Sequence, residues 1–114
     1  MPLEGSGKKQ FFIPYNDKIA DITHADTLTH TLDLATALSE TRKIISVGVT
    51  SLRVTGTGAI RVWPNEGVYG SDLNLSRQYP TQIIIKDGTN RLKYNLSVAD
   101  DDFELYCFGY VVEA

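Results

Sequence analysis

The sequence predicts an all-β protein, which we interpret as a single-domain antiparallel β-sandwich, a jelly roll of about eight strands. Segments rich in branched aliphatic and aromatic residues recur along the chain, and glycine, proline and aspartate turn signals separate them. Only one short segment has a helical pattern. The length of 114 residues favours one domain. An immunoglobulin-like sandwich is the alternative, but its Cys…Trp…Cys pattern is absent because Cys107 is the single cysteine.

The first third of the chain predicts an arm followed by two strands. We interpret residues 1–9 as an extended N-terminal arm and residues 10–114 as the sandwich domain. Residues 10–15 are apolar and aromatic, and Pro14 favours an edge strand because proline donates no backbone hydrogen bond. Residues 27–34 alternate, which predicts a strand. Its inward positions are Leu28, His30, Leu32 and Leu34.

The middle of the chain predicts a helical turn, a long strand and a hairpin. Residues 35–40 form the one helical turn. Residues 43–55 are a β-branched run whose apolar positions change phase, and this change predicts a bulge or bend near Thr50–Ser51. Gly56-Thr57-Gly58 then has the chemistry of a hairpin turn.

The second half of the chain alternates strand and turn signals. Residues 64–67 have turn chemistry, because proline fixes φ and glycine accepts a positive φ. Asp87-Gly88 predicts a second hairpin. A third, polar turn falls at residues 100–102, before the last and most apolar strand. The predicted strands are residues 59–63, 68–75, 81–86, 91–98 and 103–112.

Charge and hydropathy exclude several classes of function. A net charge of -3 and an isoelectric point near 5.2 argue against a nucleic-acid partner. No apolar run approaches the ~18–20 residues of a membrane span. The start of the chain has no signal-peptide pattern, so we expect a protein made in a cytoplasm and left there or carried out in a larger assembly. No motif for a cofactor or for catalysis is recognisable, and we expect neither.

The residues around the arm are the first candidate site. A terminal strand with aromatic side chains is typical of arms that dock on a neighbouring subunit, where main-chain hydrogen bonds and side-chain pockets hold them. We therefore expect partner binding by Lys8, Lys9, Phe11, Phe12 and Tyr15.

Three aromatic residues next to turns are the second candidate site. Trp63, Tyr69 and Tyr79 fit three interpretations: packing in the core or loops, a subunit interface, or stacking on a sugar. The sequence leaves these alternatives open.

Two segments of the chain carry clustered side chains of the types that bind metal ions. Asp100, Asp101 and Asp102 offer the oxygen ligands that Ca²⁺ prefers, although adjacent side chains point in different directions and a solvated turn is the alternative. His24, Asp26 and His30 match no zinc spacing, so structural histidines are expected there. We therefore expect no metal, with the three aspartates as the residual calcium candidates.

The second half of the chain carries a resemblance to a known group of modules. The segments that carry it are residues 58–64, 71–75, 82–85, 87–88, 92–94 and 108–111. Their order resembles small jelly-roll modules of bacterial surface and secreted proteins, with relatives among phage capsid decoration proteins and parts of tails and fibres. The acidic residue that often precedes the closing Gly-Tyr is missing, because Tyr106, Cys107 and Phe108 occupy that region, which makes the last strand more apolar.

What the resemblance implies is a binding or structural module without chemistry of its own. We therefore expect a non-enzymatic phage virion protein, a capsid decoration protein that docks through its arm and a sheet edge. Its partners would be further copies, as a homotrimer, and a larger assembly such as a capsid. The alternative is a carbohydrate-binding, lectin-like module of a fibre or surface protein, with Trp63, Tyr69 and Tyr79 stacking on the glycan.

Overall fold

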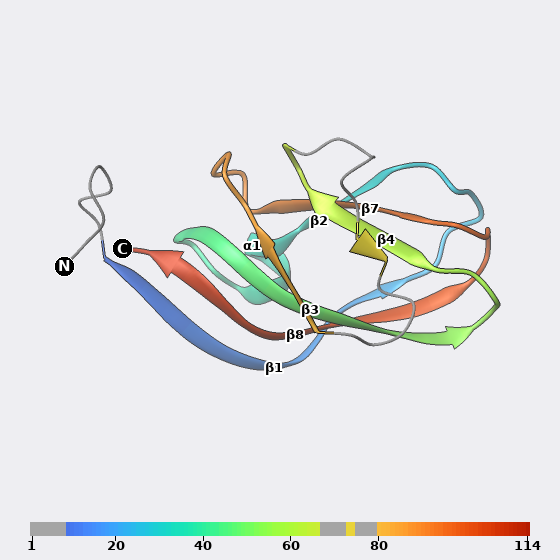
Figure 1. Ribbon diagram of the computed structural model, residues 1–114, viewed down its shortest axis with the longest axis horizontal. Coiled ribbons are helices and arrows are strands. Elements are labelled where there is room, and N and C mark those ends of the chain that lie inside the picture. The colour runs from blue at the N-terminus through green and yellow to red at the C-terminus, as the bar shows by residue number, and fades with distance from the viewer. Residues whose placement is uncertain (1–8, 67–72, 75–79) are drawn as a thin grey trace.

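The computed structural model describes residues 9–66, 73–74 and 80–114, and in this part the chain folds almost entirely into strands (Figure 1). One short helix interrupts them. The elements are β1 (Gln10–Ile22), β2 (His30–Asp33), α1 (Leu34–Leu38), β3 (Lys43–Thr55), β4 (Ile60–Pro64), β5 (Leu73–Asn74), β6 (Thr81–Ile84), β7 (Arg91–Leu96) and β8 (Asp102–Glu113).

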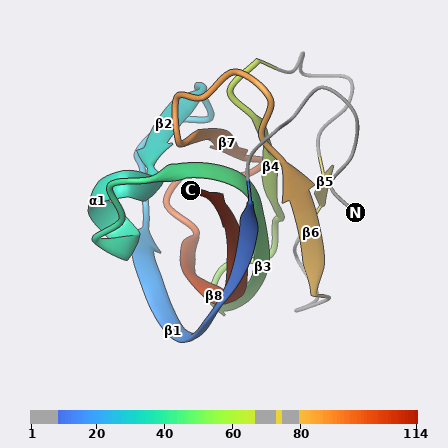
Figure 2. The ribbon, with the colours of Figure 1, turned by 90° about the vertical axis from the view of Figure 1, so that its left-hand side faces the viewer.

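The strands form two antiparallel sheets that face each other (Figures 1 and 2). We name β1-β8-β3-β6 the long sheet, because β1, β3 and β8 have 12 or 13 residues each, and β2-β7-β4-β5 the short sheet. Side chains of both sheets meet in one buried cluster. The predicted class, an all-β antiparallel sandwich, is therefore confirmed.

The strand pairs are nested, with β1 on β8, β2 on β7, β3 on β6 and β4 on β5. Additional pairs, β3 with β8 and β4 with β7, complete the sheets. This order agrees with a jelly roll. The jelly-roll connectivity itself stays a prediction, because the connections on either side of β5 run through residues outside the described part.

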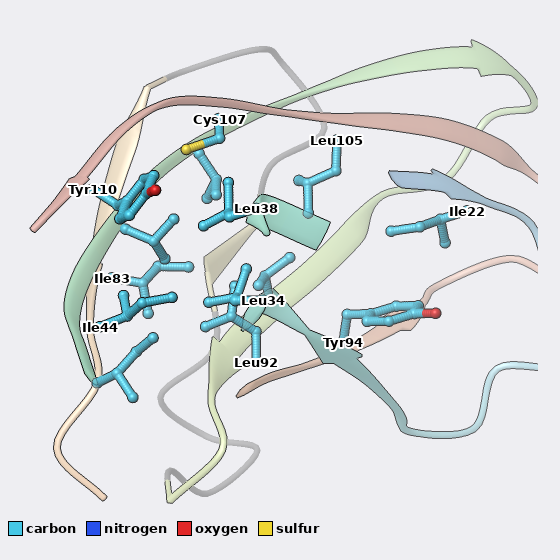
Figure 3. Close-up of a cluster of buried hydrophobic side chains, with 14 of the residues drawn as sticks. Ile22, Leu34, Leu38, Ile44, Ile83, Leu92, Tyr94, Leu105, Cys107 and Tyr110 are labelled. Carbon is cyan, nitrogen blue, oxygen red and sulfur yellow. The ribbon is translucent and has the colours of Figure 1, made fainter. Parts of the chain in front are cut away.

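The core lies between the sheets and consists of aliphatic side chains with a few aromatic ones (Figure 3). Ile44 on β3, Leu105 on β8 and Leu92 on β7 are all fully or almost fully buried. Burying such side chains stabilises the fold by about 1.5–3 kcal/mol each. Cys107 also lies in this cluster, and burial raises the pKa of its thiol, as expected for a structural cysteine.

A charged group is buried at one margin of the core. Glu40 is only 7% exposed. Its carboxylate accepts hydrogen bonds from the Arg42 guanidinium at 2.9 and 3.1 Å and from the Tyr110 hydroxyl at 3.0 Å. The bonds from Arg42 are the largest cause that lowers the pKa of Glu40 to about 2. Burial, followed by the bond to Glu40, raises the pKa of Tyr110 to about 12.

The first strand is an edge strand, as predicted, but it extends from Gln10 to Ile22 rather than ending at residue 15. Its pairing with β8 shifts register between Pro14 and Asp17 and again between Lys18 and Ala20. These irregularities break the alternation of apolar residues, so the sequence pattern hid the second half of the strand.

The predicted bulge near Thr50–Ser51 in β3 is wrong. Thr50 and Ser51 pair with consecutive residues of β8, and Ser51 stays buried in the same phase as Val49. The pairing with β8 instead shifts at three other places, between Ile44 and Ser46, between Gly48 and Val49, and between Arg53 and Thr55. The phase change in the sequence therefore does not mark a register shift at Thr50–Ser51 itself.

The two predicted hairpins are also wrong. Gly56 and Gly88 do take positive φ angles of 107° and 74°, so turns exist at both places. However, the turn after β3 leads to β4 in the short sheet, and the turn after β6 leads to β7 in the short sheet. Turn chemistry reverses the chain locally, whereas the core decides which strands pair.

The helical turn is confirmed with shifted bounds, and β2 is shorter than predicted. Residues 27–29 lie outside any strand, and Leu28 is 67% exposed rather than directed inward. The Asp33 carboxylate caps α1 by accepting a hydrogen bond from the Ala35 N–H at 3.1 Å. α1 lies beside β2 and β1 at one end of the sandwich (Figure 2). No helix among the described residues is long and apolar enough to span a membrane.

The remaining strands follow the predictions closely. β4, β6, β7 and β8 lie within one or two residues of the expected ranges. Of the strand predicted over residues 68–75, only β5 lies in the described part, and most of the predicted arm lies outside it.

Candidate docking surface

The outer face of the long sheet carries two uncharged rows of residues that cross all four strands. Each row is defined by the register of neighbouring strands, and the rows lie two residues apart, so they share one face. One row contains Phe12, Val111, Ser46 and Ile84, and the next contains Pro14, Gly109, Gly48 and Gln82. Together with Phe108, we call these residues the outer patch.

Two paired glycines form the centre of the outer patch. Gly48 on β3 lies opposite Gly109 on β8. The Phe108 ring lies over Gly48 and the Phe12 ring lies over Gly109, so a Cβ at either position would clash with a ring. Glycine at these positions therefore permits aromatic rings to lie close against the backbone.

Both rings stay accessible although they cover the glycines. Phe12 is 62% exposed and Phe108 is 41% exposed, while Ile84 in the same patch is 57% exposed. Covering a glycine with an aromatic ring is by itself a way to stabilise a sheet. Local packing of this kind does not require the rings to stay exposed, whereas contiguous exposed apolar patches are typical of interaction surfaces.

A β-bulge at Phe108 in the central strand β8 places Phe108 and Gly109 together on the outer face. In the pairing with β3, Gly48 lies opposite Gly109 and Val49 lies opposite Cys107, which leaves Phe108 unpaired. The extra residue changes the phase of the strand, so that both Cys107 and Tyr110 reach the core. Bulges can re-aim side chains and are over-represented next to functional sites.

A shallow hollow lies beside the rings on the same face. Its volume is about 360 Å³. Gln82 Nε2 donates a hydrogen bond to Ser46 Oγ at 2.9 Å inside it. The hollow is lined by Gln10, Ile45, Ser46, Gln82, Ile84 and Val111. Its lining therefore combines apolar side chains with the amide groups of Gln10 and Gln82.

Charged residues border the patch at both ends. At one end, Glu113 lies opposite Lys43 on β3. At the other, Lys18 Nζ lies 3.0 Å from Asp21 Oδ1 and 3.5 Å from Glu104 Oε2. An apolar centre with a charged rim is the usual anatomy of a protein–protein interface.

The free edge of β1 is less suited to docking than the sequence implied. Pro14 cannot donate a backbone hydrogen bond, and the two register shifts that follow bend the strand. Lys18 adds a charge to the same stretch. Proline, bulges and lysine are the features that protect edge strands against pairing with another chain.

The residues predicted to bind a partner do not form one surface. Phe12 lies in the outer patch, but Phe11 lies opposite the buried Val112 and so faces the other side of the sheet. Tyr15 packs on the core, with its ring centroid 6.2 Å from that of Tyr110. Lys9 is exposed just before β1, and Lys8 lies outside the described residues.

The predicted aromatic site at the turns is not supported as a ligand surface. Trp63 is only 2% exposed, so of the three interpretations packing within the protein is the one that fits its position. Tyr69 and Tyr79 lie outside the described residues.

The three aspartates diverge instead of forming a calcium site. Asp101 is buried, and its Oδ2 accepts a hydrogen bond from the Gly58 N–H at 2.6 Å. Asp102 Oδ2 accepts a hydrogen bond from the Thr55 hydroxyl at 2.9 Å, and Asp100 is exposed. These bonds tie the turn before β8 to the turn after β3. The described residues contain no group of three or more His, Cys, Asp or Glu side chains arranged to hold a metal ion.

Sequence reasoning missed most of the outer patch. Gly48 within a β-branched run was the available signal, because glycine inside a strand often marks a close approach of another group. The pairing of Gly48 with Gly109, and the placement of Ile84 in one row with Val111, depend on register and were not readable from either segment alone.

Searches of protein-family models, of curated proteins and of solved structures find no match to the chain.

Proposed function

We propose that the protein is a non-enzymatic structural protein that docks on other protein subunits through the outer patch. The observation that carries the proposal is the pair Gly48–Gly109 under two exposed phenylalanine rings. Exposed aromatic anchors within an uncharged centre supply most of the binding energy in typical interfaces.

More specifically, we propose a phage virion decoration protein that acts as a homotrimer on a capsid. Two features support this: the resemblance of the second half of the chain to such modules, and the β-sandwich fold. The outer patch supports a docking mode in which the contact lies on a sheet face rather than on the protected edge of β1. The arm before β1 would then add contacts to the same larger assembly.

One of the three aromatic residues expected to stack on a glycan, Trp63, is not accessible to a ligand. Trp63 is buried, so a glycan would have to use other groups. The hollow with Gln10 and Gln82 offers both an apolar surface and amides for a sugar. Glycan binding at this hollow is therefore the alternative function.

The test is the solution mass of the full chain by light scattering. We expect a trimer for the wild type, a monomer for the double variant Phe12→Ser/Phe108→Ser, and an unchanged trimer for the control Val54→Ser. Val54 is a matched control because it is 54% exposed on β3 but lies outside the patch. A trimer that persists in the double variant would contradict docking through the outer patch.

A monomeric wild type would overturn self-assembly. In that case, screening wild type and the Gln82→Ala variant on a glycan array decides between the two functions. Retention that Gln82→Ala weakens would favour the carbohydrate-binding alternative, and absence of retention would reject it.

A further inference from the structure

Two histidines lie face to face at the end of the sandwich where the chain passes from β1 to β2. The His24 and His30 ring centroids are 3.6 Å apart and the ring planes differ by 8°. Both rings also lie against the Tyr94 ring of β7, at 5.6 and 5.7 Å. This stack therefore connects the loop of residues 23–29 to the short sheet.

Hydrogen bonds hold the same loop in three directions. His24 Nε2 and the Tyr94 hydroxyl share a hydrogen bond of 2.8 Å. His30 Nε2–H donates to Asp26 Oδ1 at 2.8 Å, and the Leu28 N–H donates to the same oxygen at 3.1 Å. The Asp100 N–H donates to the His24 carbonyl at 2.8 Å, which ties in the turn before β8.

The stack is sensitive to charge because of its geometry. Two imidazole rings in parallel contact pack well while at least one of them is neutral. Two imidazolium rings at this separation repel each other, and the partly buried site screens that repulsion less than water does. His30 already has the Asp26 carboxylate as a partner for its proton, whereas His24 has a neutral phenol.

We propose that the His24–His30 stack is an acid-sensitive latch, which holds residues 23–29 against β7 while His24 is neutral and releases them when His24 takes up a proton. The covalent structure is unchanged, and the only ligand is the proton. The released segment connects β1 in the long sheet to β2 in the short sheet, so the latch controls how one end of the sandwich is closed.

The charged and titratable groups around His24 act in opposite directions. Burial is the largest cause that lowers the pKa of His24, and the charge of His30 on β2 lowers it further. Asp26, in the same loop, raises it by a smaller amount. From β7 the stack faces Tyr94, whose own pKa burial raises, so its hydroxyl stays neutral. From the turn before β8 the contact is the Asp100 N–H, which carries no charge.

The direction of the pH effect follows from the lowered pKa. The unfolded chain has an ordinary histidine pKa of 6.5 and so binds the proton more readily than the closed latch does. The contribution of His24 to stability is therefore complete above pH 6.5 and is lost as the pH falls from there through the lowered pKa. Acidification opens the latch, and a return to neutral pH closes it.

The experiment follows both histidines and the loop amides by NMR between about pH 8 and pH 5. We expect His24 to titrate below 6.5. We expect the protection factor of the Asp100 N–H to fall at least about tenfold through this titration, while that of the Leu105 N–H in β8 stays constant. A protection factor of Asp100 that does not change through the His24 titration would overturn the proposal.

The variant His30→Gln tests whether the stack is responsible. It removes the second ring and its charge, so the pKa of His24 should rise and the acid-induced loss of protection should shrink several-fold. The same titration in variant and wild type would show that the stack does not act as a latch. The variant Tyr94→Phe gives an independent reading, because it removes the hydroxyl partner and should lower the protection of Asp100 even at pH 8.

Discussion

Phe103 and Phe108 lie on the same strand, β8, and face opposite sides of the long sheet. Phe103 is 1% exposed in the core, whereas Phe108 is 41% exposed above Gly48 on the outer face. They lie an odd number of positions apart, so alternation along the strand places them on opposite faces, and the bulge at Phe108 changes the phase only of the residues that follow it. The same residue type thus contributes to the fold on one face and to a surface on the other, because burial and not identity decides its energetic role.

The largest expected effect separates these two phenylalanines directly. Phe103→Ala should lower the free energy of unfolding by about 3–5 kcal/mol, because it leaves a cavity in a close-packed core. Chemical denaturation, with the midpoint and slope fitted separately, measures the loss. A loss below that of Phe108→Ala would contradict the assignment of the two faces.

A second prediction concerns the polar margin of the inner face. Tyr110→Phe should cost about 1.5–3 kcal/mol, since it removes a hydrogen bond to the buried Glu40 carboxylate. Denaturation at neutral pH measures this loss. An unchanged stability would mean that Arg42 alone satisfies the carboxylate.

The same carboxylate predicts a pH dependence. The pKa of Glu40 is lowered from 4.5 to about 2, so its stabilising contribution is present above 4.5 and is lost as the pH falls toward 2. Denaturation curves recorded between neutral pH and about pH 3 should therefore show a fall in stability that Glu40→Gln reduces. Equal acid sensitivity of the wild type and this variant would assign the effect to other groups.

A smaller effect is expected on the outer face. Gly48→Ala should cost about 1–2 kcal/mol, because the added methyl group displaces the Phe108 ring. The cost should shrink in a Phe108→Ala background, where no ring is present to clash. A double-mutant cycle measures this coupling, and additive effects would show that the ring and the glycine are independent.

The smallest expected effect is that of Phe108→Ala itself. We expect about 1 kcal/mol or less, since much of the ring already contacts water. The informative result is the combination of a small loss of stability with a loss of self-association in light scattering. A large loss of stability without any change in mass would make Phe108 a structural residue only.

Local sequence patterns determined the class of the fold and most of the strands. Alternation identified β7, where Leu92, Tyr94 and Leu96 are all buried. The long β-branched run identified β3, and the aspartates marked the turn before β8. These features depend on residues close together in the chain, which is why the sequence alone revealed them.

The tertiary structure decided which strands pair and what the pairing brings together. The turns at Gly56 and Gly88 lead from one sheet to the other rather than forming hairpins. Register between distant strands set Gly48 opposite Gly109, and the bulge at Phe108 brought Gly109 to the same face as Phe108. The face of β1 that joins the outer patch, the burial of Trp63 and the stacking of His24 on His30 likewise depend on segments far apart in sequence. Their positions are set by packing around a shared core, and no local pattern encodes that packing by itself.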